Sequence, residues 1–183
     1  SIQVTSVTTP ALTAITKWTA RGYRTNLTAD DAEVTASTSI TPAYDETNLT
    51  YYGVYRKGIN IYSGVSKSTS SVAYQYLNIN NNTVSSITLP VPASIEHWST
   101  KGYRTNTTAS SASVAVTTAE KTITPAYSTN AITYYAVYTR TLTIAYNANG
   151  GTGTTANTTK TIYLNTNSTT TSDQKVTLAN SGF

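Results

Sequence analysis

The chain has 183 residues, a length that suits one domain or two small ones, since domains usually have ~100–200 residues. Its net charge is +4, but charged residues make up only 11% of the chain and the twelve basic ones form no cluster, which argues against nucleic-acid binding. Cysteine is absent and no apolar run approaches the ~20 residues of a membrane span, so the sequence excludes disulfides, thiol chemistry and a transmembrane helix.

Short runs rich in Thr, Val, Ile and Tyr predict β-strands along most of the chain. The longest alternation of apolar and polar side chains covers Thr133 to Tyr146, and its period of two is that of a half-buried strand. Tyr51 to Ile61 shows the same alternation. The other expected strands are Ile2 to Val7, Val72 to Ile79, Lys121 to Ala126, Lys160 to Leu164 and Lys175 to Leu178.

Two segments are the best helix candidates in a chain that otherwise predicts little helix. Thr28 to Val34 has an N-cap-like Thr followed by early acids, and Thr108 to Val116 is its counterpart with serines in place of those acids. Asn147 to Gly153, with the sequence NANGGTG, predicts a turn because its glycines can take positive φ.

The chain also repeats itself. The sequence ITKWTARGYRTN at Ile15 to Asn26 returns 80 residues later as IEHWSTKGYRTN at Ile95 to Asn106. The sequence SITPAYDETNLTYYGVY at Ser39 to Tyr55 returns 83 residues later as TITPAYSTNAITYYAVY at Thr122 to Tyr138. Such recurrence at a fixed spacing is typical of tandem modules that share one fold.

Motif order divides the chain into three predicted modules, with each boundary at a basic residue that interrupts the apolar alternation. Residues 1–57 are the back part of a first module, residues 58–140 are a second module, and residues 141–183 are a partial third. The third is indicated by TIYLN at Thr161 to Asn165, which echoes QYLN at Gln75 to Asn78.

One motif resembles a known family. Tyr146 to Gly151, with the sequence YNANGG, is similar to the opening of the Listeria–Bacteroides repeat, also called the internalin B-repeat. Trp18 and Trp98 stand where that family has its Trp block. The closing strand of the family is matched by YYGVY at Tyr51 to Tyr55 and by YYAVY at Tyr134 to Tyr138.

The chain departs from the family pattern at several positions. The Gly before the family's Trp is Lys17 in one copy and His97 in the other, and the family's final Trp is Tyr55 or Tyr138. The resemblance implies a mainly β fold of tandem small β-grasp-like repeat modules with little helix. It also implies spacing and adhesion on large Gram-positive surface proteins, without catalysis.

The recurring aromatic and Arg side chains are the candidate site residues. Trp18, Trp98, Tyr23 and Tyr103 recur at matched positions, as expected either of core packing in each module or of stacking on a sugar or peptide ligand. Arg24 and Arg104 follow the two tyrosines. They are expected either to hydrogen-bond locally or to form a repeated anion contact.

We expect no catalytic, cofactor or metal site. His97 is the single His and is matched by Lys17, which argues against general acid–base chemistry. The cluster of Asp30, Asp31 and Glu33 has the ligand types of a Ca²⁺ site, but serines stand at the matching positions, so a solvated loop is favoured. A Lys–Asn isopeptide bond is disfavoured because the candidate Lys residues, Lys57 and Lys101, are Arg in the other copy.

These features favour a non-enzymatic repeat segment of an extracellular, cell-wall-associated bacterial surface protein, acting as a stalk or spacer and in adhesion. The alternatives are a carbohydrate-binding module with exposed Trp and Tyr, and a self-assembling filament subunit. The expected partners are host or cell-wall glycans or surface proteins, without nucleic acid. Ser1 to Lys57 and Thr141 to Phe183 are expected to be partial repeats with open strand edges, which would allow head-to-tail self-association.

Overall fold

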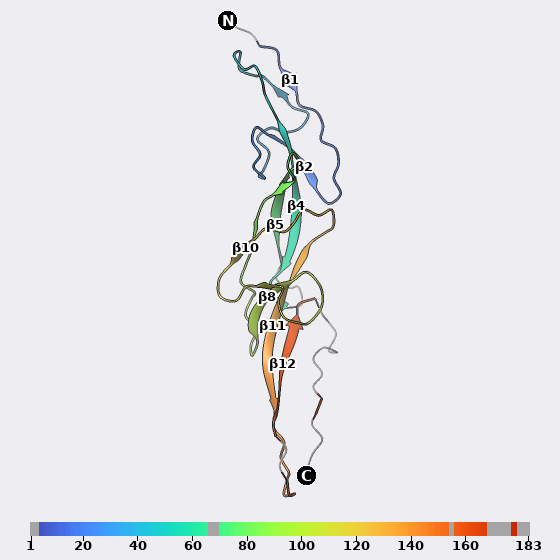
Figure 1. Cartoon of the computed structure of the whole chain (residues 1–183), viewed down its shortest axis with the longest axis vertical. Coiled ribbons are helices and arrows are strands. Elements are labelled where there is room, and N and C mark those ends of the chain that lie inside the picture. The colour runs from blue at the N-terminus through green and yellow to red at the C-terminus, as the bar shows by residue number, and fades with distance from the viewer. Residues whose placement is uncertain (1–3, 66–69, 154–155, 168–176, 179–183) are drawn as a thin grey trace. The chain divides into compact units, whose positions relative to one another are not determined.

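The computed structural model describes residues 4–65, 70–153, 156–167 and 177–178. These residues form twelve β-strands and no α-helix, so the protein is mainly β, as the sequence predicts (Figure 1). The strands are β1 (Val7–Thr8), β2 (Thr19–Arg24), β3 (Ser39–Ile40), β4 (Tyr52–Tyr62), β5 (Ser70–Asn78), β6 (Thr83–Val84), β7 (Ile87–Leu89), β8 (Ser99–Arg104), β9 (Val114–Ala115), β10 (Lys121–Ile123), β11 (Thr133–Ile144) and β12 (Thr158–Asn165).

The chain folds into two compact units, each assembled from separate stretches of sequence. These stretches fall within residues 1–59, 72–88 and 122–132 for unit 1, and within residues 60–71, 89–121 and 133–183 for unit 2. Each unit therefore takes strands from more than one of the three predicted modules. The module boundaries at residues 57 and 140 follow motif order along the chain and stay a prediction.

In unit 1, β4 is the central strand. It pairs antiparallel with β2, with Thr19 opposite Arg56 and Arg24 opposite Tyr52, and it also pairs with β5, which in turn pairs with β6. Two short ribbons, β1 with β3 and β7 with β10, complete the unit. A hydrophobic core cluster of the unit contains Trp18, Tyr55, Leu77, Leu12, Ile15 and Val84.

In unit 2, β11 takes the place that β4 has in unit 1. It pairs antiparallel with β8 and with β12, which lies beside it in Figure 1. Its first residues, 133–135, pair in parallel with residues 60–62, the end of β4 that belongs to unit 2. β9 pairs with β8. Most of the buried side chains of the unit are apolar or aromatic, among them Leu89, Tyr103, Val116, Ala136, Val137, Tyr138 and Ile162, and a few are polar, such as Asn165.

A matched β-bulge marks the GYRTN motif of each unit. Arg21 is the extra residue where β2 pairs with β4, and Lys101 is the extra residue where β8 pairs with β11. Gly22 and Gly102 follow them at φ +137° and +124°. A Cβ at Gly22 would lie 2.1 Å from the carbonyl oxygen of Val34, so the close approach of the backbone requires Gly here.

The predicted elements are partly confirmed. Val72 to Ile79 and Lys160 to Leu164 correspond to β5 and β12, and Thr133 to Tyr146 corresponds to β11. The helix candidates Thr28 to Val34 and Thr108 to Val116 are wrong, because both segments are loops with short bridges to β2 or β8.

The remaining predicted segments are shorter than expected or fall partly outside the described residues. Lys121 to Ala126 contains the three-residue strand β10. Ile2 to Val7 and Lys175 to Leu178 lie partly outside the described residues.

Asn147 to Gly153 is a turn as predicted, with Gly150 and Gly153 at positive φ. In the described part of the chain, no helix is long and apolar enough to cross a membrane.

Candidate functional site

Trp18 is a core residue of unit 1. Its side chain is only 6% exposed and packs with Tyr55 and Leu77. The indole Nε1–H donates a hydrogen bond to the carbonyl oxygen of Ser128 at 2.9 Å, and the ring of Tyr127 stacks on it at a centroid distance of 5.9 Å. A Trp held in this way offers no exposed ring face for a sugar.

Lys57 lies beside Trp18 and is itself buried, with 2% exposure. Its ammonium group lies 5.3 Å from the centroid of the Trp18 ring, a cation–π distance, and donates a hydrogen bond to the Ser128 carbonyl oxygen at 2.9 Å. Burial lowers the pKa of Lys57. The amine thus contacts a main-chain carbonyl and an aromatic ring, which gives no support to an isopeptide bond.

Trp98 occupies the matching position in unit 2 but is half-buried. The Arg140 guanidinium lies 5.5 Å from the centroid of its ring, as Lys57 lies over Trp18. Trp98 ends the same type of tight turn, in which its amide donates to the carbonyl of Ile95 and His97 takes a φ of +64°. The pair of flat, exposed Trp rings that a carbohydrate-binding module would need is therefore not present at these two positions.

Tyr23 and Tyr103 are packing residues with one polar contact each. They are 7% and 0% exposed, and burial raises the pKa of Tyr103. The Tyr23 hydroxyl donates to the carbonyl oxygen of Pro10 at 3.0 Å, and the Tyr103 hydroxyl donates to that of Pro90 at 2.9 Å. The structure places both aromatic rings in the core.

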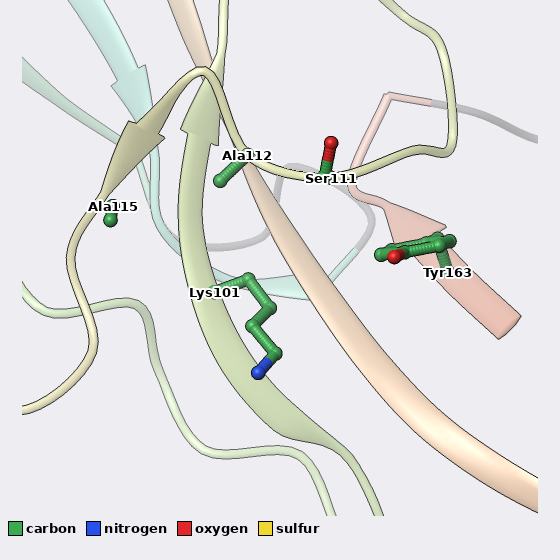
Figure 2. Close-up of a pocket in the computed structure, with 5 residues that line it drawn as sticks. All are labelled: Lys101, Ser111, Ala112, Ala115 and Tyr163. Carbon is green, nitrogen blue, oxygen red and sulfur yellow. The ribbon is translucent and has the colours of Figure 1, made fainter. Parts of the chain in front are cut away.

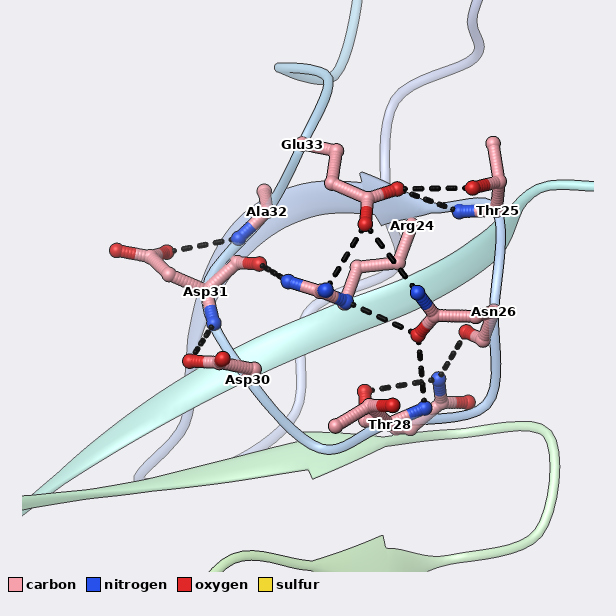
Figure 3. Close-up of polar contacts among 9 residues, drawn as sticks. Arg24, Thr25, Asn26, Thr28, Asp30, Asp31, Ala32 and Glu33 are labelled. Atoms are coloured by element: carbon pink, nitrogen blue, oxygen red, sulfur yellow. Dashed lines mark hydrogen bonds and ion pairs between the residues drawn. The ribbon is translucent and has the colours of Figure 1, made fainter.

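Arg24 organises the loop that follows β2 (Figure 3). Its Nη1 donates to the carbonyl oxygen of Asp31 at 2.6 Å, its Nε donates to Asn26 Oδ1 at 3.2 Å, and its Nη2 lies 2.8 Å from Glu33 Oε1. Glu33 also accepts hydrogen bonds from the Thr25 amide and hydroxyl. The hydrogen bond from the Thr25 backbone N–H is the main cause of the lowered pKa of Glu33. All of these contacts are internal to the loop.

Arg104 repeats the main-chain part of this network in unit 2. Its Nε donates to Asn106 Oδ1 at 2.9 Å and its Nη1 donates to the carbonyl oxygen of Ser111. Ser113 replaces Glu33 and donates instead to the carbonyl oxygen of Tyr103 at 3.0 Å. Local hydrogen bonding is the role that the structure gives both Arg side chains.

Two buried Asn side chains hold the same loops, and the sequence analysis did not single them out. Asn78 Nδ2 donates to the carbonyl oxygens of Asn26 at 3.1 Å and Thr28 at 3.4 Å. Asn165 Nδ2 donates to those of Asn106 and Thr108, both at 3.0 Å. We call each arrangement the asparagine clamp. The recurring Tyr-Leu-Asn sequence was the signal that could have found it.

The carboxylates of the acidic cluster, Asp30, Asp31 and Glu33, accept hydrogen bonds from nearby groups of the same unit. Asp31 accepts hydrogen bonds from Arg21 Nε at 2.8 Å and Nη2 at 3.1 Å, and this pair lowers the pKa of Asp31. Asp30 Oδ1 accepts from the Asp31 amide at 2.8 Å. Among the described residues, no group of three or more His, Asp or Glu side chains could hold a metal ion. His97 is exposed and lies 3.3 Å from Glu96, a surface contact of little energetic weight.

Comparison with protein-family models, with curated proteins and with solved structures finds no match to this chain.

A pocket of about 310 Å³ opens on unit 2 (Figure 2). Lys101 on β8, Tyr163 on β12, and Ser111, Ala112 and Ala115 on the chain between β8 and the end of β9 line it. It combines one ammonium group, one phenol and two small apolar side chains. Such a surface can bind a small polar ligand, whereas it lacks the paired acid and base groups of hydrolytic chemistry.

Proposed function

We propose that this chain is a non-enzymatic structural repeat segment of an extracellular bacterial surface protein, acting as a stalk or spacer and in adhesion. The observation that carries the proposal is the asparagine clamp. Asn78 and Asn165 come from different strands, yet each bonds the same two carbonyls of the GYRTN loop in its own unit. Recurrence of a buried polar contact is expected when each copy must build the same fold by itself.

The other recurring side chains support the same role, because their polar groups are used within the fold. The two tyrosines bond a Pro carbonyl in each unit, and the two arginines bond the main chain of the following loop. The groups of a catalytic site would instead converge on one pocket, with a nucleophile beside a base. A spacer needs only that each unit hold its shape.

Exposed tyrosines support the adhesive part of the proposal. Tyr44, Tyr74 and Tyr127 are 71%, 49% and 41% exposed, so their rings are available to a partner. Tyr binds partners with a large contact area and little loss of conformational entropy, as in antibody combining sites. The resemblance to the Listeria–Bacteroides repeat family supports a cell-surface location.

Single-molecule force spectroscopy of the whole chain tests the spacer role. We expect discrete unfolding events, because the clamp ties β5 to the loop after β2 across a long stretch of sequence. Asn78→Ala should lower the force of one event, whereas Asn80→Ala, a change at an exposed neighbour, should leave it unchanged. A chain that extends without resolved events would contradict the proposal.

The location is tested separately by antibody labelling of intact bacteria that produce the protein. We expect labelling of unpermeabilised cells and its loss after mild protease treatment of the cell surface. Labelling that requires permeabilised cells would contradict the extracellular assignment and leave the mechanical test unaffected.

A further inference from the structure

The pocket of unit 2 stands where unit 1 has an internal ion pair. In unit 1, the bulge residue Arg21 binds the Asp31 carboxylate through two hydrogen bonds of 2.8 and 3.1 Å. The phenol of Tyr76 is close enough to act electrostatically on Arg21. In unit 1 the basic group is thus paired with an acid, and a tyrosine lies near enough to influence the base.

Unit 2 keeps two of these three groups and loses the acid. Lys101 is the bulge residue of β8 and Tyr163 is the tyrosine of the Tyr-Leu-Asn sequence in β12, but Ser111 stands at the position of Asp31. Within the described residues, no side-chain hydrogen bond or ion pair of Lys101 is present. The pocket of about 310 Å³ is therefore a place in which the base remains and its carboxylate is missing.

The shape of the pocket adds a second requirement. In Figure 2 the Tyr163 ring projects from β12 with its hydroxyl on the side of Lys101, whereas the Ser111 hydroxyl is turned away from Lys101. Ser111 thus contributes space, and the methyl groups of Ala112 and Ala115 contribute an apolar wall. The tyrosine ring and these methyl groups suit the C–H faces of a sugar ring, and the volume lies at the lower end of the usual range for ligand sites, ~300–1,000 Å³.

We infer that the unit 2 pocket binds the carboxylate of an acidic sugar, a hexuronic acid being the simplest example, with Lys101 taking the role toward the ligand that Arg21 has toward Asp31. This inference goes beyond the spacer role, because a spacer requires no ligand site. The contact is open to solvent and depends on one exposed ammonium group, so binding should be weak, with a Kd of roughly millimolar order.

Titration of ¹⁵N-labelled protein with sodium glucuronate, followed by ¹H–¹⁵N NMR at constant ionic strength, tests the inference. We expect saturable shifts at the amides of Lys101, Ser111 and Tyr163 and none at Arg21 or Asp31, which supply the matched internal control. Glucose tests the need for the carboxylate, and sodium acetate tests the need for the sugar ring. Both should bind at least ~10-fold more weakly than glucuronate.

Variants in both units sharpen the test. Ser111→Asp should rebuild the internal pair with Lys101 and abolish the shifts, and Lys101→Gln should abolish them without changing the spectrum of unit 1. Asp31→Ser should free Arg21 and create a second glucuronate site in unit 1. Unsaturable shifts, equal binding of glucose or acetate, or full binding by Ser111→Asp would each overturn the inference, and none of these results bears on the force measurements.

Discussion

The two tryptophans show how far equivalence in sequence predicts equivalence in space. Trp18 and Trp98 stand in the same motif, end the same turn and each lie under a basic side chain. Trp18 nevertheless packs against Tyr127 and Ser128, whereas Trp98 is half-buried. Burial, and not the motif, sets the free energy that each ring contributes.

Replacing each Trp by Ala measures this difference. Trp18→Ala should lower the free energy of unfolding of unit 1 by ~3–5 kcal/mol, because it leaves a cavity and removes the hydrogen bond to Ser128. Trp98→Ala should cost unit 2 clearly less, since part of its ring area is in water in the folded state. Urea denaturation followed by circular dichroism checks both, and equal losses would show that exposure in the structure does not govern their contributions.

The sequence alone identified the recurring Tyr and Arg side chains as candidate site residues, but it left their roles open. In the structure, Tyr23 and Tyr103 are buried, which favours core packing over ligand stacking. Arg24 and Arg104 bond nearby main-chain carbonyls, which favours local hydrogen bonding over an anion contact. The asparagine clamp was missed for a physical reason: Asn is common in the exposed turns of this chain, and nothing in its type distinguishes a buried donor from a solvated one.

At the scale of elements, the helix predictions for the segments after β2 and β8 were wrong, because both segments are loops. The helix expected at Thr28 to Val34 does not form because short polar side chains bond nearby amides instead. Asn26 Oδ1 accepts from the Thr28 amide, and Asp30 and Asp31 accept from the next amide in each case. This competition with helical hydrogen bonds is the known cost of Asn, Asp and Ser in a helix.

The bulge of β8 provides a test of backbone geometry. Gly102→Ala should destabilise unit 2 by ~3 kcal/mol or more, because the new Cβ would lie 2.0 Å from the Val114 carbonyl oxygen at a φ of +124°. Gly150→Ala is the matched control, since φ is +91° there but no atom lies within 4 Å of the added Cβ. It should cost only ~1 kcal/mol. Thermal melts of both variants check this, and similar costs would mean that the close approach to Val114 is relaxed at little expense.

For the whole molecule, alternation of side chains along β4 and β11 was enough to predict a mainly β protein. It was not enough to predict how the strands combine. Each unit draws on three stretches of sequence, and the pairing of β11 with the end of β4 is parallel and distant along the chain. Local periodicity carries no information on such long-range pairing, because it shows which face of a strand is buried and not which strand lies beside it.

The two units should respond differently to acid, because they differ in their carboxylates. The pKa values of Asp31 and Glu33 in unit 1 are lowered, chiefly by the hydrogen bonds from Arg21 to Asp31 and from the Thr25 amide to Glu33. A lowered pKa in the folded state means that the unfolded chain binds protons first as the pH falls. The stability from these groups is therefore complete above the unfolded pKa values of ~4 and is lost as the pH falls through the lower folded values.

Unit 2 has Ser111 and Ser113 at these positions and lacks this source of acid sensitivity. We expect urea titrations, followed by NMR at a series of pH values, to show that the urea midpoint for amides of unit 1 decreases as the pH is lowered from 5 to 2. The midpoint for amides of unit 2 should change much less. The double variant Asp31→Ser, Glu33→Ser should make unit 1 weaker at pH 5 and flatten its pH profile. Parallel losses in both units of the unmodified protein, or an unchanged profile in the variant, would show that other carboxylates control the acid response.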